Sequence, residues 1–459
     1  MKNTRARFGR VLSPVHLIPL SFLAAILVGT ALLWLPISTA PGQHTGPLTA
    51  LFTATTSVCV TGLVVVDTYI HWSLFGKVVI LLLIQLGGLG VITVFSTLLL
   101  LLGRKFTLSD RTLLSETFNL NTRSGLIRFL RRVVTGTFLI EGIGAALYSI
   151  RFIPRYGAAR GIWYAVFHAV SAFCNAGLDI LGPDSLCGYS SDAFFLLVTM
   201  ALIVSGGLGY VVWFDLTDSL RALLHPKDRR RGRLRLTEHT KLVLRLTAVM
   251  IFCGAFLFFL TERRNPATIG AMPTGEAILN CLFQSVTLRT AGFSTFPQQS
   301  LGEISCLIGD VWMFIGGSPI GTAGGVKTVT VFIVFWNAVY YIGHRRSTAI
   351  FRRKISEEMV RKAAAIVVIS ALSTILMSVL LCVVSGAPLQ DALYEMFSAL
   401  ATVGLSRALT PTLSGASRLL VVTGMYLGRI GPISMAIFFA NVRSKGRGME
   451  YAEGRFYVG

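Results

Sequence analysis

The sequence predicts an all-α integral membrane protein: four repeated helix–pore loop–helix units around a pseudo-fourfold central pore, with eight spanning helices and four re-entrant pore helices. Three observations predict this fold. Hydrophobic residues make up 53% of the 459 residues and charged residues only 14%, whereas an ordinary soluble domain carries about 25% charge. Long stretches carry no charge at all. A lone glycine follows a short apolar stretch four times at nearly constant spacing.

The uncharged stretches are the first of these elements. They cover residues 15–37, 78–103, 193–214 and 363–387, and each has the length of about 20 residues that crosses a bilayer. The basic N-terminal segment MKNTRARFGR precedes an apolar run that is too long for a typical signal peptide and lacks a clear cleavage site. We therefore expect several spans and no cleavable signal.

Positive charge lies between the expected spans rather than in them. The net charge is +21, and 30 of the 42 Lys and Arg residues fall in segments 1–10, 104–132, 221–241, 345–362 and 443–455. The positive-inside rule assigns these five segments, and both termini, to the cytoplasm. The run DRRRGRLR resembles a nucleic-acid patch, but beside apolar spans a loop facing anionic lipid is the better interpretation.

The recurring glycines divide the chain into units. Gly62, Gly177, Gly292 and Gly404 are separated by 115, 115 and 112 residues. The basic segments bound four repeats that each cross outward and return. We place them at 1–103, 104–223, 224–343 and 344–442, followed by a cytoplasmic tail at 443–459.

Each repeat shows the same order of elements. A first helix is expected at 15–36, 126–152, 239–260 or 363–386. A stretch of about 12 residues follows at 47–58, 162–173, 275–287 or 389–400, which is too short to span and is typical of a re-entrant pore helix. Second helices containing glycine clusters are expected at 73–102, 192–223, 304–343 and 417–442. The alternative is a generic transporter whose helices are merely glycine-rich, but the fixed offset of the four glycines favours a pore.

The glycine segments themselves, 60–63, 174–178, 289–293 and 401–405, share no carboxylate, His or Cys. Side chains therefore supply no common catalytic or metal site, whereas backbone carbonyls can, because Gly permits the dihedrals and close approach that stacking them requires. Rings of carbonyl oxygen replace the hydration shell of a monovalent cation such as potassium, and the negative ends of the pore helices favour a cation below them. Only the glycine is common, so we expect few ion sites and loose selectivity. The predicted ion-binding residues are Val60, Thr61, Gly62, Asn175, Ala176, Gly177, Thr290, Ala291, Gly292, Thr402, Val403 and Gly404.

Charged residues follow several of these segments. Asp67 and Asp179 either concentrate cations at the outer mouth or are ordinary loop acids and helix caps, and the sequence leaves both interpretations open. Arg407 places a positive charge three residues after Gly404, and we expect Asp67 or Asp179 to pair with it.

The third repeat contains a predicted gate. Residues 316–325 read GGSPIGTAGG, and a helix does not continue through five glycines and a proline. Unwound backbone at membrane depth requires a protein-lined or wet cavity, so we expect a loop that obstructs the pore below the filter; a simple kink at Pro319 is the alternative. The motif GTAGGVKT is not a P-loop, because Val326 replaces its second glycine.

Two basic residues accompany this loop. Arg429 lies inside the last span, where a charge is costly and indicates function. We expect it to hold the loop closed through the loop carbonyls and to repel cations. Lys327 either contributes to the gate or extends to the cytoplasmic interface. The predicted gate residues are Gly316, Gly317, Ser318, Pro319, Gly321, Thr322, Gly324, Gly325, Lys327 and Arg429.

These motifs resemble the Trk/Ktr/HKT superfamily of potassium transporters. TGLVVVDT, FCNAGLD, TLRTAGFST and ATVGLS are similar to its four filter segments, and FIGGSPIGTAGGVKT to its broken third-repeat helix. The early first helix and the tail YAEGRFYVG are most similar to the Ktr membrane subunit. The resemblance implies potassium uptake across a bacterial cell membrane, a homodimer, a ring of cytosolic nucleotide-binding regulatory subunits and, in many members, sodium dependence. It also implies that Arg289 points away from the ions and pairs with an acid, for which Glu276 and Glu395 are candidates.

Other functional classes find little support in the sequence. The chain has no H-E-x-x-H, no C-x-x-C and no paired acid and base, so we expect neither an enzyme nor a covalently bound cofactor. The bound species is expected to be potassium, with sodium as the second candidate. A carrier coupled to sodium or protons remains the alternative within transport, with Asp310 and Glu141 as candidate coupling residues.

Overall fold

The computed structural model describes residues 14–101, 125–224, 236–344 and 347–431. The predicted tail 443–459 and the basic segment 1–10 lie outside these ranges, as do 104–124 and 225–235 of two basic loops. The described residues are mostly helical, and the one sheet among them is a hairpin of β1 (Ala349–Ile350) and β2 (Arg353–Lys354). This confirms the predicted all-α class.

The four first helices are long and continuous. They are α2 (Pro14–Trp34), α8 (Leu126–Tyr156), α12 (Glu238–Glu262) and α16 (Glu357–Ser385), and each is long and apolar enough to cross a membrane. Their outer faces expose large apolar side chains, such as Leu27, Phe252 and Val383, of which Val383 is 76% exposed. Apolar surface on this scale is suited to lipid rather than water.

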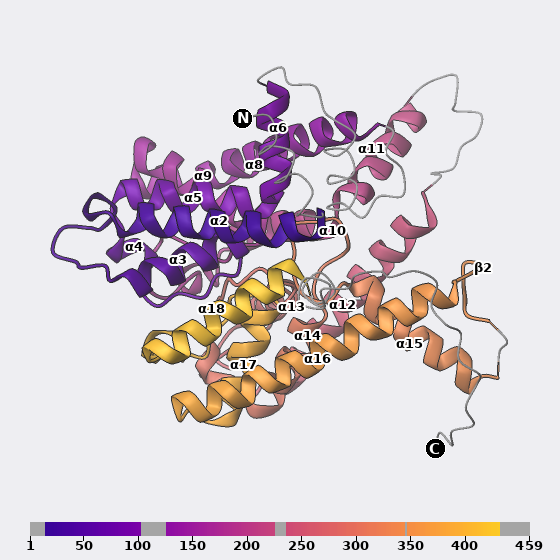
Figure 1. Ribbon diagram of the computed structural model, residues 1–459. Helices are drawn as coiled ribbons and strands as arrows, with labels where there is room; N and C mark the ends of the chain where they lie inside the picture. Colours follow the sequence, from indigo (N-terminus) through magenta and orange to yellow (C-terminus); the bar gives the residue numbers. More distant parts are fainter. Residues whose placement is uncertain (1–13, 102–124, 225–235, 345–346, 432–459) are drawn as a thin grey trace, which may run out of the picture.

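A short helix follows each first helix, as predicted. These are α3 (Pro47–Cys59), α9 (Ala158–Cys174), α13 (Thr274–Thr287) and α17 (Leu389–Leu400). Each packs against the first helix of its own repeat, and its C-terminal half is buried in the middle of the molecule (Figure 1). In α3 this buried half, Thr53–Cys59, consists of small apolar and hydroxyl side chains.

The second helices are broken, which the sequence prediction of continuous helices over 73–102 and 192–223 missed. α5 (Leu74–Leu89) and α6 (Val91–Leu101) meet at 97°, and α10 (Ala193–Leu208) and α11 (Tyr210–Leu224) meet at 101°. The breaks fall at Gly90 and Gly209, whose φ values of 86° and 89° end a right-handed helix. If each bent pair counts as one span, six spans pass a length and composition test among the described residues.

The remaining two second helices differ again. In the third repeat, α14 (Glu303–Phe314) and α15 (Thr328–Ile342) are separated by a non-helical segment. In the fourth, α18 (Gly415–Ile430) ends at the limit of the described residues. The four first helices are continuous, whereas three of the four second helices are interrupted. At most six spans are long and apolar enough to cross a membrane among the described residues, so the eight crossings stay a prediction.

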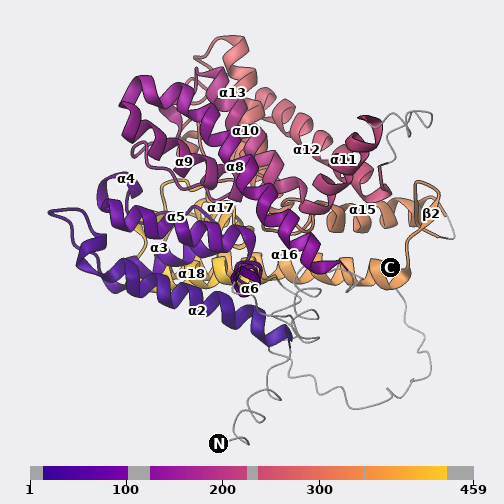
Figure 2. The same ribbon diagram turned by 90° about the horizontal axis from the view of Figure 1, so that it is seen from above.

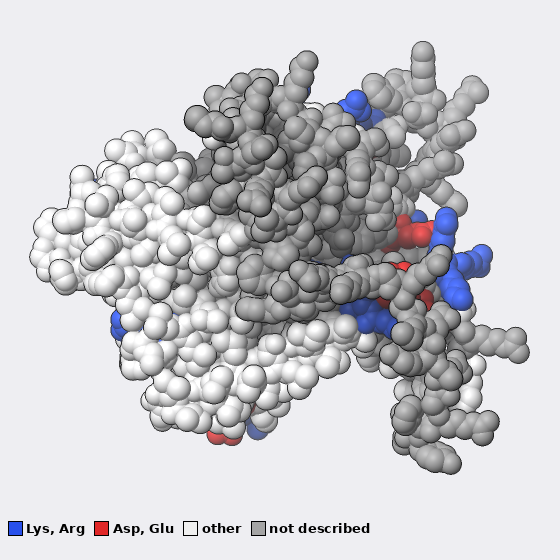
Figure 3. Space-filling view, viewed as in Figure 1, with Lys and Arg blue, Asp and Glu red and all other residues white. Residues whose placement is uncertain are grey.

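Contacts between repeats close a ring. The second helix of each repeat packs against the pore helix of the next: α5 against α9, α10 against α13, and α14 against α17. The last contact, α18 against α3, joins the fourth repeat to the first, and the view from above shows the four units around a common centre (Figure 2). Described charged side chains gather mainly at the end near β2, while the body over α2 and α5 carries few (Figure 3).

Candidate functional site

The four predicted glycines meet at the centre of the ring. A methyl group built on Gly62 would lie 3.2 Å from Cα of Gly177 and 3.3 Å from Cα of Gly404. One built on Gly292 would lie 3.1 Å from Cα of Gly177 and 3.3 Å from Cα of Gly404. Glycines more than 340 residues apart in sequence are thus in mutual contact, and no side chain fits between them.

The same contacts run around the ring in one direction. A methyl group on Gly62 would lie 2.7 Å from the carbonyl oxygen of Ala176. A methyl group on Gly177 would lie 2.6 Å from the carbonyl oxygen of Ala291, and one on Gly292 would lie 2.5 Å from the carbonyl oxygen of Val403. The methyl position of Gly404 overlaps the carbonyl oxygen of Thr61, which closes the cycle. Each strand therefore presents to its neighbour the carbonyl that precedes its own glycine. This arrangement has pseudo-fourfold symmetry at the level of single atoms.

The backbone of all four strands alternates in handedness. The residue two positions before each glycine has a positive φ: 55° at Val60, 60° at Asn175, 70° at Thr290 and 52° at Thr402. The glycines themselves have φ values from 65° to 102°, while the intervening residues have negative φ. A positive φ is unusual for any residue with a side chain and especially for a β-branched one such as Val60. Backbone conformations of this kind cost about 1–3 kcal/mol and cluster at functional sites.

The amide groups of the strands are satisfied from behind by the pore helices. The N–H before each glycine donates to a carbonyl of its own pore helix, from Thr61 to Thr56 at 2.9 Å and from Ala176 to Ser171 at 2.8 Å. Ala291 and Val403 make the corresponding bonds to Thr287 and Ser398, both at 2.8 Å. The donors of the strands therefore face the helices.

The side chains of the same four helix residues also fasten the strands, which the sequence reasoning missed. The hydroxyl oxygens of Thr56 and Ser398 accept from the N–H of Gly62 and Gly404, both at 2.9 Å. Ser171 and Thr287 donate instead to the carbonyl that follows their glycine, at 2.6 and 2.7 Å. The available signal was a Ser or Thr five or six residues before every glycine.

The two acids near the outer ends of the strands have local roles. The carboxylate of Asp67 accepts from the N–H groups of Tyr69 and Ile70 and caps α4 (Thr68–His71). Asp179 is half-buried and accepts from the N–H of Leu181 at 3.2 Å. Burial, followed by the neighbouring charge of Asp67, raises the pKa of Asp179 to about 7.

Both predicted arginine pairings were wrong. Arg407 pairs with Asp391 of α17, with Nε and Oδ1 3.3 Å apart, and not with Asp67 or Asp179. Arg289 is buried against α12 and donates to the hydroxyl of Thr247 at 3.4 Å. Neither predicted acid pairs with Arg289 within the described part of the chain, because Glu395 accepts from Ser406 and Thr410 instead.

The segment 315–327 between α14 and α15 is non-helical over its whole length, which excludes a simple kink at Pro319. It is held by backbone bonds to the broken helix of the second repeat. Ser318 N–H donates to Gly207 at 2.9 Å, Thr322 N–H donates to Gly206 at 3.2 Å, and the carbonyl of Ile320 accepts from Tyr210 N–H at 2.8 Å. The break at Gly209 exposes the carbonyls that this segment uses.

The far side of the segment lies against the strand that contains Gly404. A methyl group on Gly324 would overlap the hydroxyl of Thr402 and lie 3.0 Å from the carbonyl oxygen of Ala401. A methyl group on Gly316 would overlap the carbonyl of Gly324. The glycines of GGSPIGTAGG therefore allow the segment to fold on itself and to approach the inner end of the strand.

Both predicted basic residues contact this segment. Arg429 donates from Nη1 to the carbonyl of Thr322 at 2.7 Å and from Nη2 to the carbonyl of Gly87. Lys327 donates from Nζ to the carbonyls of Ala323 and Gly324, at 2.6 and 3.5 Å, so its side chain turns back into the segment and does not extend to the interface. Two cationic side chains thus bind three consecutive loop carbonyls.

Comparisons with known proteins agree with this arrangement. Residues 17–449 match the TrkH family of cation transport proteins. The chain is 36% identical to the potassium/sodium uptake protein NtpJ of Enterococcus hirae over 437 residues, which cover 94% of both chains. It is also 36% identical to the Ktr system potassium uptake protein B of Bacillus subtilis over 450 residues, 97% of both chains. The crystal structure of the potassium transporter TrkH from Vibrio parahaemolyticus shares its fold, with a TM-score of 0.73 at 14% identity over 94% of this chain and 86% of that one. The chain is a multi-pass membrane transport protein, not an enzyme, and it belongs to the TrkH family.

Proposed function

We propose that this chain is the pore-forming subunit of a Ktr-type potassium uptake system. The observation that carries the proposal is the closed cycle of glycine and carbonyl contacts at the centre of the four repeats. The names of the relatives support the choice of ion, because potassium uptake is named for both of the relatives that are 36% identical.

The strand geometry supports a carbonyl-lined filter. Alternating backbone handedness turns successive carbonyls of a strand to the same side, and the N–H groups of the strands already bond to the pore helices behind them. The carbonyls of residues 60–62, 175–177, 290–292 and 402–404 are then free to replace the water around a potassium ion. The C-terminal ends of α3, α9, α13 and α17 add partial negative charge from four directions.

We propose that segment 316–325 is the gate below this filter. Its contact with Thr402 and Ala401 supports this role, because an ion that leaves the fourth strand on this side would meet the segment. Arg429 and Lys327 hold its carbonyls and add a positive barrier to cations. Opening requires the segment to give up its hydrogen bonds to Gly206 and Gly207.

The proposal includes an assembly and an orientation. We place the chain in the bacterial cell membrane with both termini in the cytoplasm, where most of its basic residues lie, and we propose a homodimer on a ring of cytosolic nucleotide-binding subunits. Anionic lipid is the other expected contact of the basic loops. The end near β2, where described charges gather, is the cytoplasmic end in this orientation (Figure 3).

Potassium uptake tests the proposal directly. Expression of the chain in a bacterial strain that lacks its own potassium uptake systems should restore growth at low potassium, and the Gly62→Ser variant should lose the preference for potassium over sodium. Failure of well-expressed wild-type chain to restore growth, alone and with a nucleotide-binding partner subunit, would refute it.

A coupled carrier is the second candidate, and two buried acids favour it. Glu141 on α8 is 5% exposed and accepts from the side-chain amide of Gln85, and Asp310 on α14 is 4% exposed. A buried carboxyl within a span is a candidate for ion or proton coupling. Single-channel steps in a planar bilayer support a channel, whereas saturable potassium flux that requires a sodium or proton gradient supports a carrier.

A further inference from the structure

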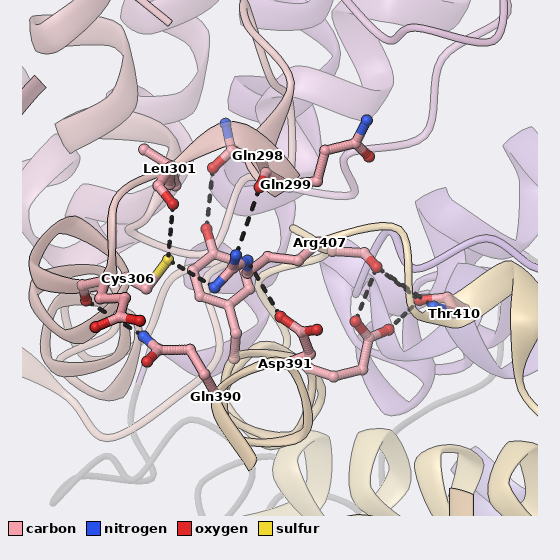
Figure 4. Close-up of polar contacts among 12 residues, drawn as sticks. Gln298, Gln299, Leu301, Cys306, Gln390, Asp391, Arg407 and Thr410 are labelled. Carbon is pink, nitrogen blue, oxygen red and sulfur yellow. Dashed lines mark hydrogen bonds and ion pairs between the residues drawn. The ribbon is translucent and has the colours of Figure 1, made fainter. Parts of the chain in front are cut away.

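Arg407 joins the fourth filter strand to the third repeat. It follows Gly404 by three residues, and its guanidinium donates from Nη1 to the Cys306 sulfur at 3.0 Å and from Nη2 to the Gln299 carbonyl at 3.4 Å. Its Nε lies 3.3 Å from Oδ1 of Asp391 on α17. Figure 4 shows the side chain of Arg407 pointing at these three partners.

The ion pair is largely withdrawn from solvent. The side chains of Arg407 and Asp391 are 16% and 28% exposed. An arginine presents its donors in a fixed planar fork, so it can hold separated acceptors in one geometry, whereas a lysine ammonium is a compact charge on a flexible stem. The positive charge that the sequence placed near the mouth is therefore compensated within the pore wall.

Neighbouring residues of α17 also form hydrogen bonds around the outer end of the fourth strand. Asp391, Tyr394 and Glu395 lie on one helix face, since their spacing is i, i+3 and i+4. The Tyr394 hydroxyl donates to the side-chain oxygen of Gln298 at 2.9 Å. Glu395, which is fully buried, accepts from Ser406 at 2.8 Å and from Thr410. Hydrogen bonds thus flank Arg407 on both sides of the strand's outer end.

The backbone next to Arg407 needs such support. Ala408 has a φ of 65°, a left-handed conformation that costs an L-residue about 1–2 kcal/mol. The turn lies only four residues beyond the filter glycine, so a change in its conformation moves the end of the strand.

The third strand has a different tie to its neighbour. Leu186 N–H donates to the Ser294 carbonyl at 3.0 Å, and Ser294 N–H donates to the Ser185 hydroxyl at 3.2 Å. These neutral bonds connect the third repeat to the second at the position where Arg407 connects the fourth to the third. The outer end of the fourth strand is thus joined to its neighbour by a charged donor, which Asp391 of its own repeat pairs with, whereas the third is joined to its neighbour by neutral hydrogen bonds.

We propose that the Arg407–Asp391 pair is a positioning device that sets the geometry of the fourth filter strand, and through it the preference for potassium over sodium. Neither residue contacts the ion. The inference deepens the proposed function and rests on it.

Four variants test the pair: Arg407→Gln, Arg407→Lys, Asp391→Asn and the double variant R407Q/D391N. The matched control is Arg151→Gln, because Arg151 and Asp192 form another pair at 3.3 Å with no contact to a filter strand. Purified full-length protein in liposomes is assayed for potassium and sodium uptake, giving KM, maximal rate and ion preference for each variant. Rates are normalised to the folded protein recovered.

We expect Arg407→Gln and Arg407→Lys to lower the preference for potassium by about three- to tenfold, since both lose hydrogen bonds that a charged donor makes. Asp391→Asn should also raise the KM for potassium, because it leaves an uncompensated guanidinium in the pore wall. The double variant should recover the KM but not the preference. Arg151→Gln should match the wild type.

Wild-type preference and KM in both Arg407 variants would overturn the proposal, as would a loss of preference that merely follows the loss of folded protein. A wild-type chain without potassium flux in these liposomes would instead refute the proposed function, and the role of the pair with it. Recovery of the preference by Arg407→Lys would show that charge alone matters and would also overturn the positioning role.

Discussion

The four glycine strands repeat the same structure closely, whereas the four second helices differ from one another. The strands agree in backbone handedness and in the direction of contact around the ring, and in each of them the N–H before the glycine donates to a carbonyl of its own pore helix. The second helices bend at Gly90, bend at Gly209 or give way to segment 315–327, and the last is described only to Ile430. An ion that loses its water must be surrounded equally, whereas one obstruction is enough to stop it. Symmetry is therefore expected in the proposed filter and is unnecessary in the proposed gate.

The largest effect should follow a break in the symmetric part. Gly62→Ser places a side chain at a φ of 102° and 2.7 Å from the carbonyl oxygen of Ala176. A strain of about 1–3 kcal/mol would shift the strand, and we expect the potassium over sodium preference to fall by about tenfold. Uptake of the two ions by cells, measured at matched expression, gives this ratio.

Gly42→Ser is the matched control, because Gly42 also has a positive φ, 81°, but has open space where the side chain would go. It should keep the wild-type preference. Equal preference in the Gly62→Ser variant and the wild type would mean that the convergence of the glycines does not determine selectivity.

The asymmetric part should respond with a change in rate and not in preference. Arg429→Ala removes the bonds to the carbonyls of Thr322 and Gly87, which are among the contacts that hold the non-helical segment. Hydrogen bonds from charged donors contribute about 1.5–3 kcal/mol, and the lower end of this range corresponds to a rise in potassium flux of about tenfold, which we expect. Initial rates of uptake at saturating potassium measure this change.

Arg418→Ala on the same helix is the control, since Arg418 bonds to Leu413 at the other end of α18. Unchanged or lower flux in a well-expressed Arg429→Ala variant would contradict the role of Arg429 in holding the segment closed.

The sequence was sufficient for the features that repeat. A glycine after a short apolar stretch, four times over, predicted the pore helices and the convergence of Gly62, Gly177, Gly292 and Gly404. Composition predicted the spans. The loss of the helix over 316–325 also followed from local chemistry, because five glycines and a proline disfavour a helix in any setting.

The features that the sequence did not predict depend on tertiary contacts. A single glycine such as Gly90 or Gly209 lies inside many continuous helices, and here the bends accompany packing against other elements. The partners of Arg289 and Arg407, Thr247 and Asp391, lie in the same repeats as the arginines, but they are too far away along the chain for any helical spacing to predict the contact. The left-handed residues at Val60 and Thr402 have no sequence signal, because β-branched residues disfavour that conformation.

The outer mouth should show a moderate dependence on pH that distinguishes the second strand from the others. The carboxyl of Asp179 is charged above its raised pKa of about 7 and neutral below it. Potassium uptake should therefore fall by about threefold as external pH drops from about 8 to about 6, where ordinary carboxyls with a pKa near 4 do not titrate. Asp179→Asn should remove this dependence and give the low-pH rate throughout.

The comparison for this prediction is Asp67→Asn. Asp67 faces Asp179 and caps α4, so its loss should lower the pKa of Asp179 and shift the midpoint to lower pH without removing the dependence. A pH profile of Asp179→Asn that overlays the wild type would exclude Asp179 as its source.

The smallest effects should come from the four hydroxyls that fasten the strands, and they test how equal the strands are. Thr56→Val and Ser398→Ala leave the buried N–H of Gly62 or Gly404 without an acceptor, which costs about 1–3 kcal/mol. Ser171→Ala and Thr287→Val remove only a donor to a carbonyl, and carbonyls tolerate the loss of a partner better. We therefore expect ion preference to fall by about threefold in the first pair and by less than about twofold in the second.

Thr56→Ser keeps the hydroxyl and should behave as the wild type. Equal losses in all four variants would mean that the strands are functionally equivalent despite their different bonds, and a larger loss in the second pair would contradict the assigned roles of donor and acceptor.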